Sequence, residues 1–173
     1  MEQKIIIAGA GGQGIMFLGK VLAEAAMLEG KRVTYLPAYG AEVRGGTANC
    51  MVTISGEEIG SPFVESADII VAMNQPSLDR FEARLKAKGT LVVNSSLSAL
   101  PKSTKKTLSF PFTGIALTMG DGRIANMVCL GCLAQKTGVV KLETIFKLMQ
   151  KFASKKELME INIRAITLGA ELK

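Results

Sequence analysis

The chain has 173 residues, of which 48% are hydrophobic and 21% charged, with three cysteines and no histidine. This length predicts a single domain, residues 1–173, with enough apolar side chains for a substantial core. No apolar run is long enough to cross a membrane, so no membrane partner is expected. An odd number of cysteines argues against a disulfide framework and predicts a reducing, cytoplasmic location.

The lack of histidine restricts the chemistry available to this chain. Ser-His-Asp, Cys-His and histidine–metal sites are all excluded, so catalysis would need other groups, a cofactor or another subunit. The net charge of +6 is compatible with nucleic-acid binding. However, the basic residues are scattered outside two short clusters, at 102–106 and 155–156, and no aromatic residues interleave with them. We expect a solvated surface or contact with an acidic subunit, and no nucleic-acid partner.

The first half of the chain predicts a βαβ unit followed by an antiparallel excursion. Its elements are a strand over 4–8, a helix over about 15–28 ended by Gly30, a strand over 32–36, a loop over 37–46 and a strand over 47–55. A turn at Gly56 then leads to a short strand at 58–59, which would complete a hairpin.

The second half predicts further strands and helices in alternation. Its elements are a buried strand over 68–73, a helix opened by Pro76 and ended by Gly89, strands at 91–93 and 108–112, an apolar run at 115–118, and two or three helices within 124–137, 141–152 and 155–171. Within the helix that Pro76 opens, Leu78, Phe81 and Leu85 would share one face. The helix over 124–137 is apolar nearly all round and must lie in the core or at an interface.

Alternating strands and helices predict an α/β fold. We expect a three-layer, Rossmann-like sheet that is mainly parallel with an antiparallel hairpin, and a helical C-terminal region. In such sheets, ligands and partners lie outside the carboxyl ends of the strands. That rule places four segments on one rim: 9–14, 39–46, 74–76 and 94–96.

A glycine-rich turn follows the first predicted strand. Its residues, with G-x-G-x-x-G spacing, are Gly9, Gly11, Gly12, Gln13 and Gly14. Such glycines permit a tight turn and the close approach of an anion or another backbone at a helix N-terminus. A dinucleotide site also needs an acidic residue at the end of the second strand, about 20 residues on. Pro37 follows that strand with no Asp or Glu, which disfavours an NAD site; Arg32 leaves an NADP variant open.

A second glycine-rich loop carries Tyr39, Glu42, Arg44, Gly45 and Gly46. An arginine beside paired glycines can present its guanidinium and backbone N–H groups together to a phosphate or carboxylate. The alternative is a turn in which Glu42 and Arg44 pair with each other or with a neighbouring chain.

Polar residues also follow two of the later strands. Asn74 and Gln75 open a helix and either cap it or bind a ligand at its N-terminus. Asn94 and Ser95 follow the next strand, where turn chemistry is the alternative to ligand binding.

Two of the cysteines, Cys129 and Cys132, have C-x-x-C spacing. Redox and cluster-binding motifs normally lie in loops or at strand–helix junctions. This pair lies in an apolar helical run, so we interpret both as small buried hydrophobic residues. With three cysteines, the chain alone cannot ligate an ordinary Cys₄ cluster.

Four motifs in this order resemble one family. They are Gly9-x-Gly-Gly-Gln-Gly-Ile15, Tyr39-Gly-x-Glu-x-Arg-Gly-Gly-Thr-Ala48, Ser61-Pro62 and Ala72-Met-Asn-Gln-Pro-Ser77. Together they resemble the gamma subunit of the 2-oxoacid:ferredoxin oxidoreductases, which also occurs as a domain of single-chain pyruvate:ferredoxin oxidoreductases. The tract 39–50 is most similar to subunits of the 2-oxoglutarate and branched-chain 2-oxoacid enzymes.

The resemblance implies a subunit of an enzyme that decarboxylates a 2-oxoacid with coenzyme A, giving acyl-CoA, CO₂ and reduced ferredoxin. Thiamine diphosphate, Mg and [4Fe-4S] clusters would belong mainly to alpha, beta and delta subunits, with no cofactor bound by this chain alone. It assigns no catalytic residue here and implies a structural or CoA-channel-forming role, with 2-oxoglutarate synthase as the implied enzyme. A homodimer is left open for the isolated chain.

Two other functions remain as alternatives. One is a free-standing nucleotide- or CoA-binding module that uses residues 9–14 as an anion cradle. The other is an autonomous NAD(P) oxidoreductase.

Overall fold

A computed structural model describes residues 2–38, 47–99, 106–152 and 156–173. The strands are β1 (Gln3–Ala10), β2 (Arg32–Ala38), β3 (Thr47–Ser55), β4 (Ala67–Ala72), β5 (Leu85–Asn94) and β6 (Lys106–Phe110). The helices are α1 (Ile15–Leu28), α2 (Gln75–Phe81), α3 (Phe112–Thr118), α4 (Ala125–Thr137), α5 (Leu142–Phe152) and α6 (Lys156–Glu171). Short 3₁₀ turns at Glu82–Arg84 and Gly122–Ile124 precede β5 and α4.

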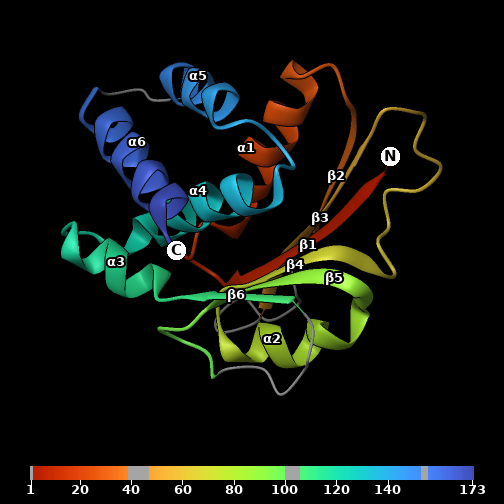
Figure 1. Cartoon of the computed structure of the whole chain (residues 1–173), viewed down its shortest axis with the longest axis horizontal. Coiled ribbons are helices and arrows are strands. Elements are labelled where there is room, and N and C mark those ends of the chain that lie inside the picture. Colours follow the sequence, from red (N-terminus) through yellow and green to blue (C-terminus); the bar gives the residue numbers. More distant parts are fainter. Residues whose placement is uncertain (1, 39–46, 100–105, 153–155) are drawn as a thin grey trace.

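The strands form one six-stranded sheet in the order β2-β3-β1-β4-β5-β6. β3 runs antiparallel to both of its neighbours, β1 and β2, whereas the β1–β4, β4–β5 and β5–β6 pairs are parallel. Helix α2 covers one face of the sheet, and α1 with α3 to α6 covers the other (Figure 1). The predicted three-layer, mainly parallel α/β fold with an antiparallel pair is therefore confirmed.

Each face of the sheet has its own apolar core. The larger core joins Ile5, Ile7 and Val52 of the central strands to α1 and the C-terminal helices. The smaller core joins Ile6, Ile70 and their neighbours to α2. Alternate residues of β1 and β4 thus enter opposite cores, which explains why these strands are apolar at nearly every position.

The predicted short strand at 58–59 is wrong, because no strand forms in this segment. Instead, β3 finds its antiparallel partners in β1 and β2. Serine hydroxyls organise the segment locally: Ser55 Oγ accepts a bond from the Glu57 amide at 3.0 Å, and Ser61 Oγ accepts one from the Phe63 amide at 3.2 Å. Bonds of this kind favour turns over strand pairing.

The predicted helix from Pro76 to about residue 88 is also wrong in its second half. Helix α2 ends at Phe81, and Leu85 begins β5, where it is 4% exposed. Gly89 lies inside β5: a Cβ there would be 2.5 Å from Leu85 Cδ1 and 2.9 Å from the Asp68 carbonyl oxygen. Gly89 therefore allows close packing within the sheet and does not end a helix.

Helix α4 was predicted to lie either in the core or at an interface, and in the structure it lies in the core. Every residue from Ala125 to Ala134 is buried by the chain itself. Its backbone meets that of α6 directly: a Cβ on Gly131 would be 1.9 Å from the Ile166 carbonyl oxygen, and one on Gly169 would be 1.9 Å from that of Val128. The two glycines let the helices cross with no side chains between them.

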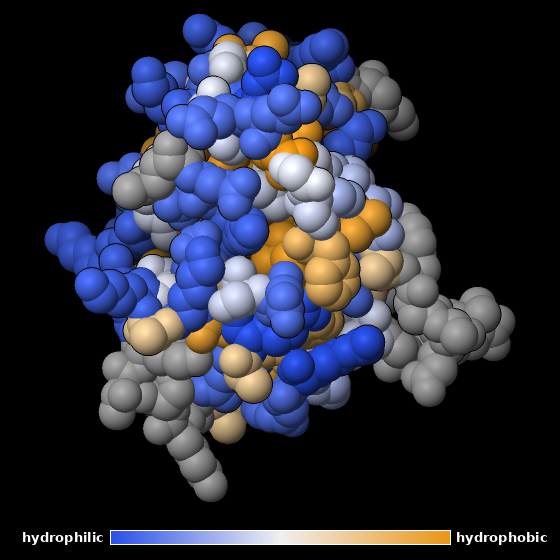
Figure 2. Space-filling view, turned by 90° about the vertical axis from the view of Figure 1, so that its right-hand side faces the viewer, coloured by the Kyte–Doolittle hydropathy of each residue, from blue (hydrophilic) through white to orange (hydrophobic). Residues whose placement is uncertain are grey.

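The side of the molecule that faces right in Figure 1 is mainly hydrophilic, with hydrophilic side chains around a small apolar area (Figure 2). No helix within the described residues has the length and apolar character needed to cross a membrane.

The α4–α6 crossing gives a first prediction, for Gly131→Ala. Helix propensity alone would favour alanine by about 1 kcal/mol. The Ile166 backbone cannot yield to the new methyl group, so we expect net destabilisation of about 1–3 kcal/mol in urea unfolding. Gly60→Ala is the control, since its Cβ meets no atom within 4 Å. A Gly131→Ala variant at least as stable as wild type would contradict the close backbone contact between α4 and α6.

Candidate functional site

The glycine loop joins β1 to α1 at the carboxyl edge of the sheet. Gly12 and Gly14 have φ values of 89° and 68°, in the left-handed region that favours glycine, and Gly14 is the N-cap of α1. A Cβ on Gly9 would be 2.6 Å from Gln13 Oε1. Gly11 differs from these three, because its φ is not positive and a Cβ there would meet no atom within 4 Å. The chain's own fold therefore gives no steric reason for glycine at position 11.

Gln13 fastens this loop to the sheet. Its Oε1 accepts a hydrogen bond from the Ala10 amide at 2.6 Å, and its Nε2 donates to the Met73 carbonyl at 3.2 Å. The Met73 amide in turn donates to the Ala8 carbonyl at 2.9 Å. The Gln13 side chain thus bridges the carboxyl ends of β1 and β4, where a ligand lies in many open α/β sheets.

Asn126 holds the other end of the loop, and sequence reasoning missed it. It lies in the first turn of α4, and its Nδ2 donates to the Gly14 carbonyl at 3.2 Å. The partners are 112 residues apart, so no local pattern could have paired them. The available signal was a lone amide in the apolar run 124–134, because a buried amide needs a hydrogen-bond partner.

Asn94 is buried and links the end of β4 to the first turn of α3. Its Nδ2 donates to the Met73 carbonyl at 3.1 Å and to Thr113 Oγ1 at 2.9 Å, while its Oδ1 accepts from the Thr113 amide at 3.3 Å. The Ser95 amide donates to the Phe110 carbonyl at 2.9 Å and extends the β5–β6 pairing, whereas the Leu97 amide donates to the Asn94 carbonyl at 3.1 Å, which is the bond of a turn.

The side chains of Asn74 and Gln75 also make hydrogen bonds within the chain. Asn74 Oδ1 accepts from the Ser77 amide at 3.1 Å, so the capping role holds. Gln75 Oε1 accepts from the Ala99 amide at 2.8 Å, and its Nε2 donates to Asp79 Oδ1 at 2.7 Å. Asn74 thus caps α2, and Gln75 bonds within α2 and to the segment that follows β5.

Three of the four predicted rim segments therefore meet: residues 9–14, 74–76 and 94–96. The fourth, with Tyr39, Glu42, Arg44, Gly45 and Gly46, lies outside the described residues. Its C-terminal flank starts at this edge, since Thr47 of β3 pairs with Ala10 of β1. Arg80 of α2 also reaches this flank and donates to Thr47 Oγ1 at 2.5 Å.

A pocket of about 420 Å³ lies beside the glycine loop. Its lining consists of Ala10, Gly11, Gly12, Gly14, Ile15, Met16, Phe17 and Ala48. The side chains are apolar, so the polar groups of the lining are backbone groups. Among the described residues, the amides of Gly11 and Gly12 have no hydrogen-bond acceptor, and they lie next to the N-terminus of α1. Such amides suit an anionic group or the carbonyls of a neighbouring chain.

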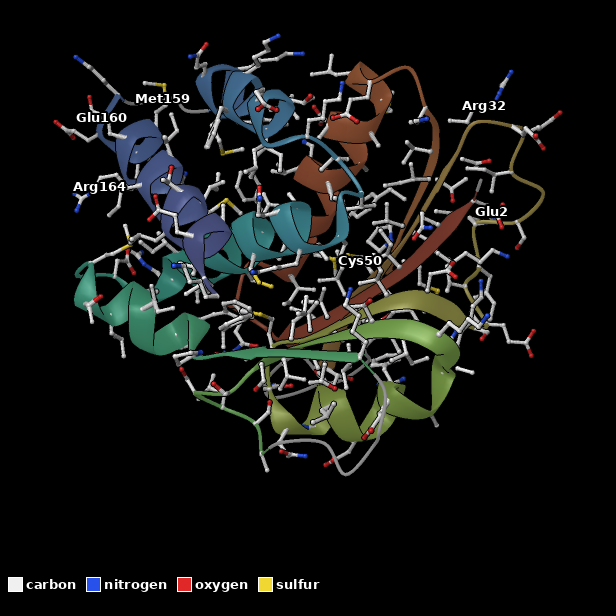
Figure 3. The ribbon with its side chains drawn as sticks, viewed as in Figure 1. Glu2, Arg32, Cys50, Met159, Glu160 and Arg164 are labelled. Carbon is white, nitrogen blue, oxygen red and sulfur yellow. The ribbon has the colours of Figure 1, made fainter. Side chains whose placement is uncertain are left out.

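The strand order excludes a dinucleotide site of the expected kind. In the dinucleotide fold, the second strand lies beside the first and carries the acidic residue to the ribose. Here β3 lies between β1 and β2. Arg32 pairs with Ser55, at the amino end of β1 and away from the glycine loop (Figure 3). The NADP variant based on Arg32 is therefore wrong.

The three cysteines are buried free thiols. Burial raises the pKa of Cys50 to about 12 and that of Cys132 to about 11, and it raises the pKa of Cys129 well above its usual range. Cys50 lies beneath α1, with Sγ 3.7 Å from the Ile15 carbonyl oxygen (Figure 3). A thiolate is the nucleophile and the metal ligand, so these thiols suit neither role. Within the described ranges, no group of three residues could hold a metal ion.

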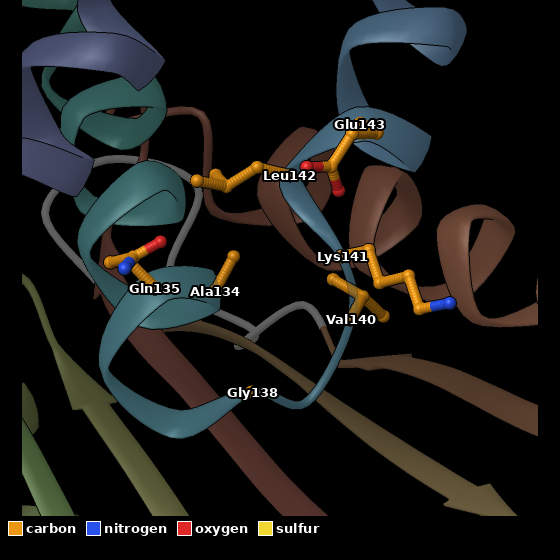
Figure 4. A pocket seen from close by; sticks show the side chains of 7 residues that line it. All are labelled: Ala134, Gln135, Gly138, Val140, Lys141, Leu142 and Glu143. Atoms are coloured by element: carbon orange, nitrogen blue, oxygen red, sulfur yellow. The ribbon is translucent and has the colours of Figure 1, made fainter.

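Two further hollows lie away from the rim. One, of about 240 Å³, lies between the end of α4 and the start of α5, and Lys141 and Glu143 are its charged residues (Figure 4). The other, of about 390 Å³, lies between α1 and α5 and is lined by Met27, Leu28, Leu148, Glu24 and Lys151. Neither contains a thiol or a pair of carboxylates.

Comparison with known proteins then decides the family. The model of the pyruvate ferredoxin/flavodoxin oxidoreductase family matches residues 4–172. The chain belongs to this family. It is 37% identical to the 2-oxoglutarate synthase subunit KorC of Methanothermobacter marburgensis, covering 99% of this chain and 97% of that protein.

Other relatives are longer. The chain is 40% identical to the ketoisovalerate oxidoreductase subunit VorA of Methanothermobacter thermautotrophicus, over 98% of this chain but 36% of VorA. The chain thus spans about a third of the length of that relative.

Solved structures have the same fold. A keto/oxoacid ferredoxin oxidoreductase gamma subunit from Geobacter sulfurreducens superposes with a TM-score of 0.88 at 32% identity, over 99% of this chain and 95% of that one. At 24% identity, the 2-oxoglutarate:ferredoxin oxidoreductase of Magnetococcus marinus, whose structure holds 2-oxoglutarate, coenzyme A and succinyl-CoA, shares the fold over 98% of this chain and 30% of its own, with a TM-score of 0.88.

The Gln13 bridge predicts the effect of Gln13→Glu. Glutamate keeps the acceptor for the Ala10 amide but places a carboxylate oxygen against the Met73 carbonyl. We expect a loss of about 1–3 kcal/mol in the free energy of unfolding. The same change at Gln135, exposed on α4, should stay within about 0.5 kcal/mol. Equal losses in the two variants would show that the bridge contributes nothing.

The buried thiols predict a pH dependence of stability. A thiol ionises near pH 9 in the unfolded chain, whereas Cys50 in the fold keeps its proton to about pH 12. Above pH 9 the unfolded state binds fewer protons, so the free energy of unfolding falls as pH rises, by up to about 1.4 kcal/mol per pH unit for each thiol. Urea unfolding of Cys50→Ala between pH 8 and 10.5 should show a shallower slope than wild type. Identical slopes would refute the assignment.

Proposed function

We propose that residues 1–173 form the gamma component of a 2-oxoacid:ferredoxin oxidoreductase, with 2-oxoglutarate synthase as the first assignment. The observation that carries this proposal is the match to KorC over almost the whole length of both chains. The proposed reaction is CoA-dependent decarboxylation of the 2-oxoacid to acyl-CoA and CO₂, with ferredoxin as the electron acceptor. Because longer relatives include VorA, a branched-chain 2-oxoacid is the second candidate substrate.

In this proposal the chain contributes no catalytic residue. It has no histidine, and burial keeps its three thiols protonated at neutral pH. The three cysteines do not fit a [4Fe-4S] cluster, which takes four thiolates, and Cys50 lies on β3 whereas Cys129 and Cys132 lie on α4. Thiamine diphosphate, Mg and the clusters are therefore assigned to the alpha, beta and delta subunits. Free thiols also agree with the proposed cytoplasmic location.

Coenzyme A is the group that this chain could help to hold. When bound, it supplies the thiol that accepts the acyl group. The amides of Gly11 and Gly12 fit a phosphate, and the apolar wall of Met16 and Phe17 fits an uncharged portion of the same molecule. The Magnetococcus enzyme, which shares the fold, binds coenzyme A. We infer that the glycine loop faces coenzyme A or the subunit that holds it; the same role for Tyr39, Glu42 and Arg44 stays a prediction from the sequence.

The alternative is a free-standing nucleotide- or CoA-binding module. Purification of a tagged chain from its native organism, under anaerobic conditions, separates the two. The proposal predicts co-purification of thiamine- and cluster-binding subunits, and viologen reduction that needs coenzyme A and 2-oxoglutarate or 3-methyl-2-oxobutanoate. The pure chain alone should be inactive. Recovery of a lone chain that binds coenzyme A tightly would favour the alternative.

Gly11 offers the most direct test of the loop, because alanine fits the isolated chain there. We expect Gly11→Ala to leave the melting temperature unchanged but to weaken assembly or raise the KM for coenzyme A about tenfold, since the methyl group enters a close contact. Gly60→Ala is the matched control, equally open and also outside the positive-φ region. If both variants assemble and turn over like wild type, the loop is not the contact surface.

A further inference from the structure

Asn126 donates a hydrogen bond to a carbonyl of the glycine loop that already has another hydrogen-bond partner. The Gly14 carbonyl already accepts the first helical bond of α1, from the Leu18 amide at 2.9 Å. Asn126 Nδ2 adds a second bond to the same oxygen at 3.2 Å. The approach is close: a Cβ on Gly14 would be 2.2 Å from that nitrogen.

The environment of Asn126 makes a polar residue costly. Asn126 is 6% exposed, and the neighbouring residues of α4 are buried and almost all apolar. A buried amide lowers stability unless it is hydrogen-bonded, so an apolar residue of similar size would serve the core better. The benefit of the amide must therefore lie at the loop that it contacts.

Helix α4, which carries Asn126, is held rigidly in the fold. Helix α4 is locked to α6 by the backbone contacts of Gly131 and Gly169. Asn126 thus ties the loop to the C-terminal helical layer, whereas Gln13 ties it to the sheet. Two independent attachments fix both the position and the direction of the short glycine loop.

We propose that Asn126 is a positioning residue, which sets the orientation of the glycine-loop amides according to the position of the α4–α6 layer. Its effect on the loop follows from this chain alone. Its effect on coenzyme A or on assembly rests on the proposed function. A displacement of α4 by a partner bound to the C-terminal helices would reach the loop through the same bond.

The test uses Asn126→Asp, which keeps the shape and replaces the donor with a carboxylate oxygen. A negative charge in the first turn of α4 is favourable to the helix. The buried carboxylate faces the Gly14 carbonyl, however, so we expect a lower melting temperature, as for Gln13→Glu. Hydrogen exchange of the full chain should be about fivefold faster in residues 10–16, a larger change than in the rest of the chain. Asn162→Asp on α6 is the control. If the Asp variant does not fold, Asn126→Ala gives the same comparison without the charge.

In the reconstituted enzyme, the positioning role predicts a higher KM for coenzyme A, or weaker assembly, with kcat retained. A purely structural role predicts faster exchange throughout the chain and a lower kcat at unchanged KM. Unchanged exchange in residues 10–16 would overturn the proposal. Faster exchange with normal coenzyme A kinetics and assembly would uphold the attachment and instead count against the function proposed for the loop.

Discussion

The bridge made by Gln13 between β1 and β4 is the interaction on which the site depends. Open α/β sheets usually leave a crevice at this point, where the helices that follow adjacent strands lie on opposite faces. Here α1 and α2 diverge in that way, but the Gln13 side chain spans the crevice and bonds to both sides (Figure 1). The surface proposed for binding therefore lies toward the N-terminus of α1 and Ala48 of β3, beside the 420 Å³ pocket.

The position of β3 between β1 and β2 affects which ligands the glycine loop can bind. Because β3 separates β2 from β1, the end of β2 is one strand further from the glycine loop than in a dinucleotide-binding sheet. The start of β3 takes that place instead and brings the flank of the second glycine-rich segment to the loop. A glycine motif of dinucleotide type is thus retained in a sheet whose geometry does not present a ribose-binding acid.

Several elements could be predicted from the sequence because a local signal specifies them. The bounds of α1 follow from the glycine loop before it and Gly30 after it, and β3 is bounded by glycines on both sides. The error at Leu85 arose because its spacing from Phe81 fits a helix face, while its burial is achieved from a strand.

The hydrogen bonds that hold the residues of the candidate site in place were less predictable. Gln13, Asn74 and Asn94 were correctly placed on one rim by the strand-end rule. Their hydrogen bonds within the chain could not be foreseen, because the partners lie on other elements. Asn126 was missed for the same reason, since its partner Gly14 is distant in sequence.

The family, the buried thiols and the braced loop support the proposed role, in which this chain presents a rigid backbone surface and partner subunits carry out the chemistry. Hydrogen exchange of the free chain compared with the assembled oxidoreductase tests this claim most directly. The account predicts that residues 9–17 become strongly protected on assembly or on addition of coenzyme A to the complex. Unchanged exchange in residues 9–17, with protection confined to other surfaces, would contradict it.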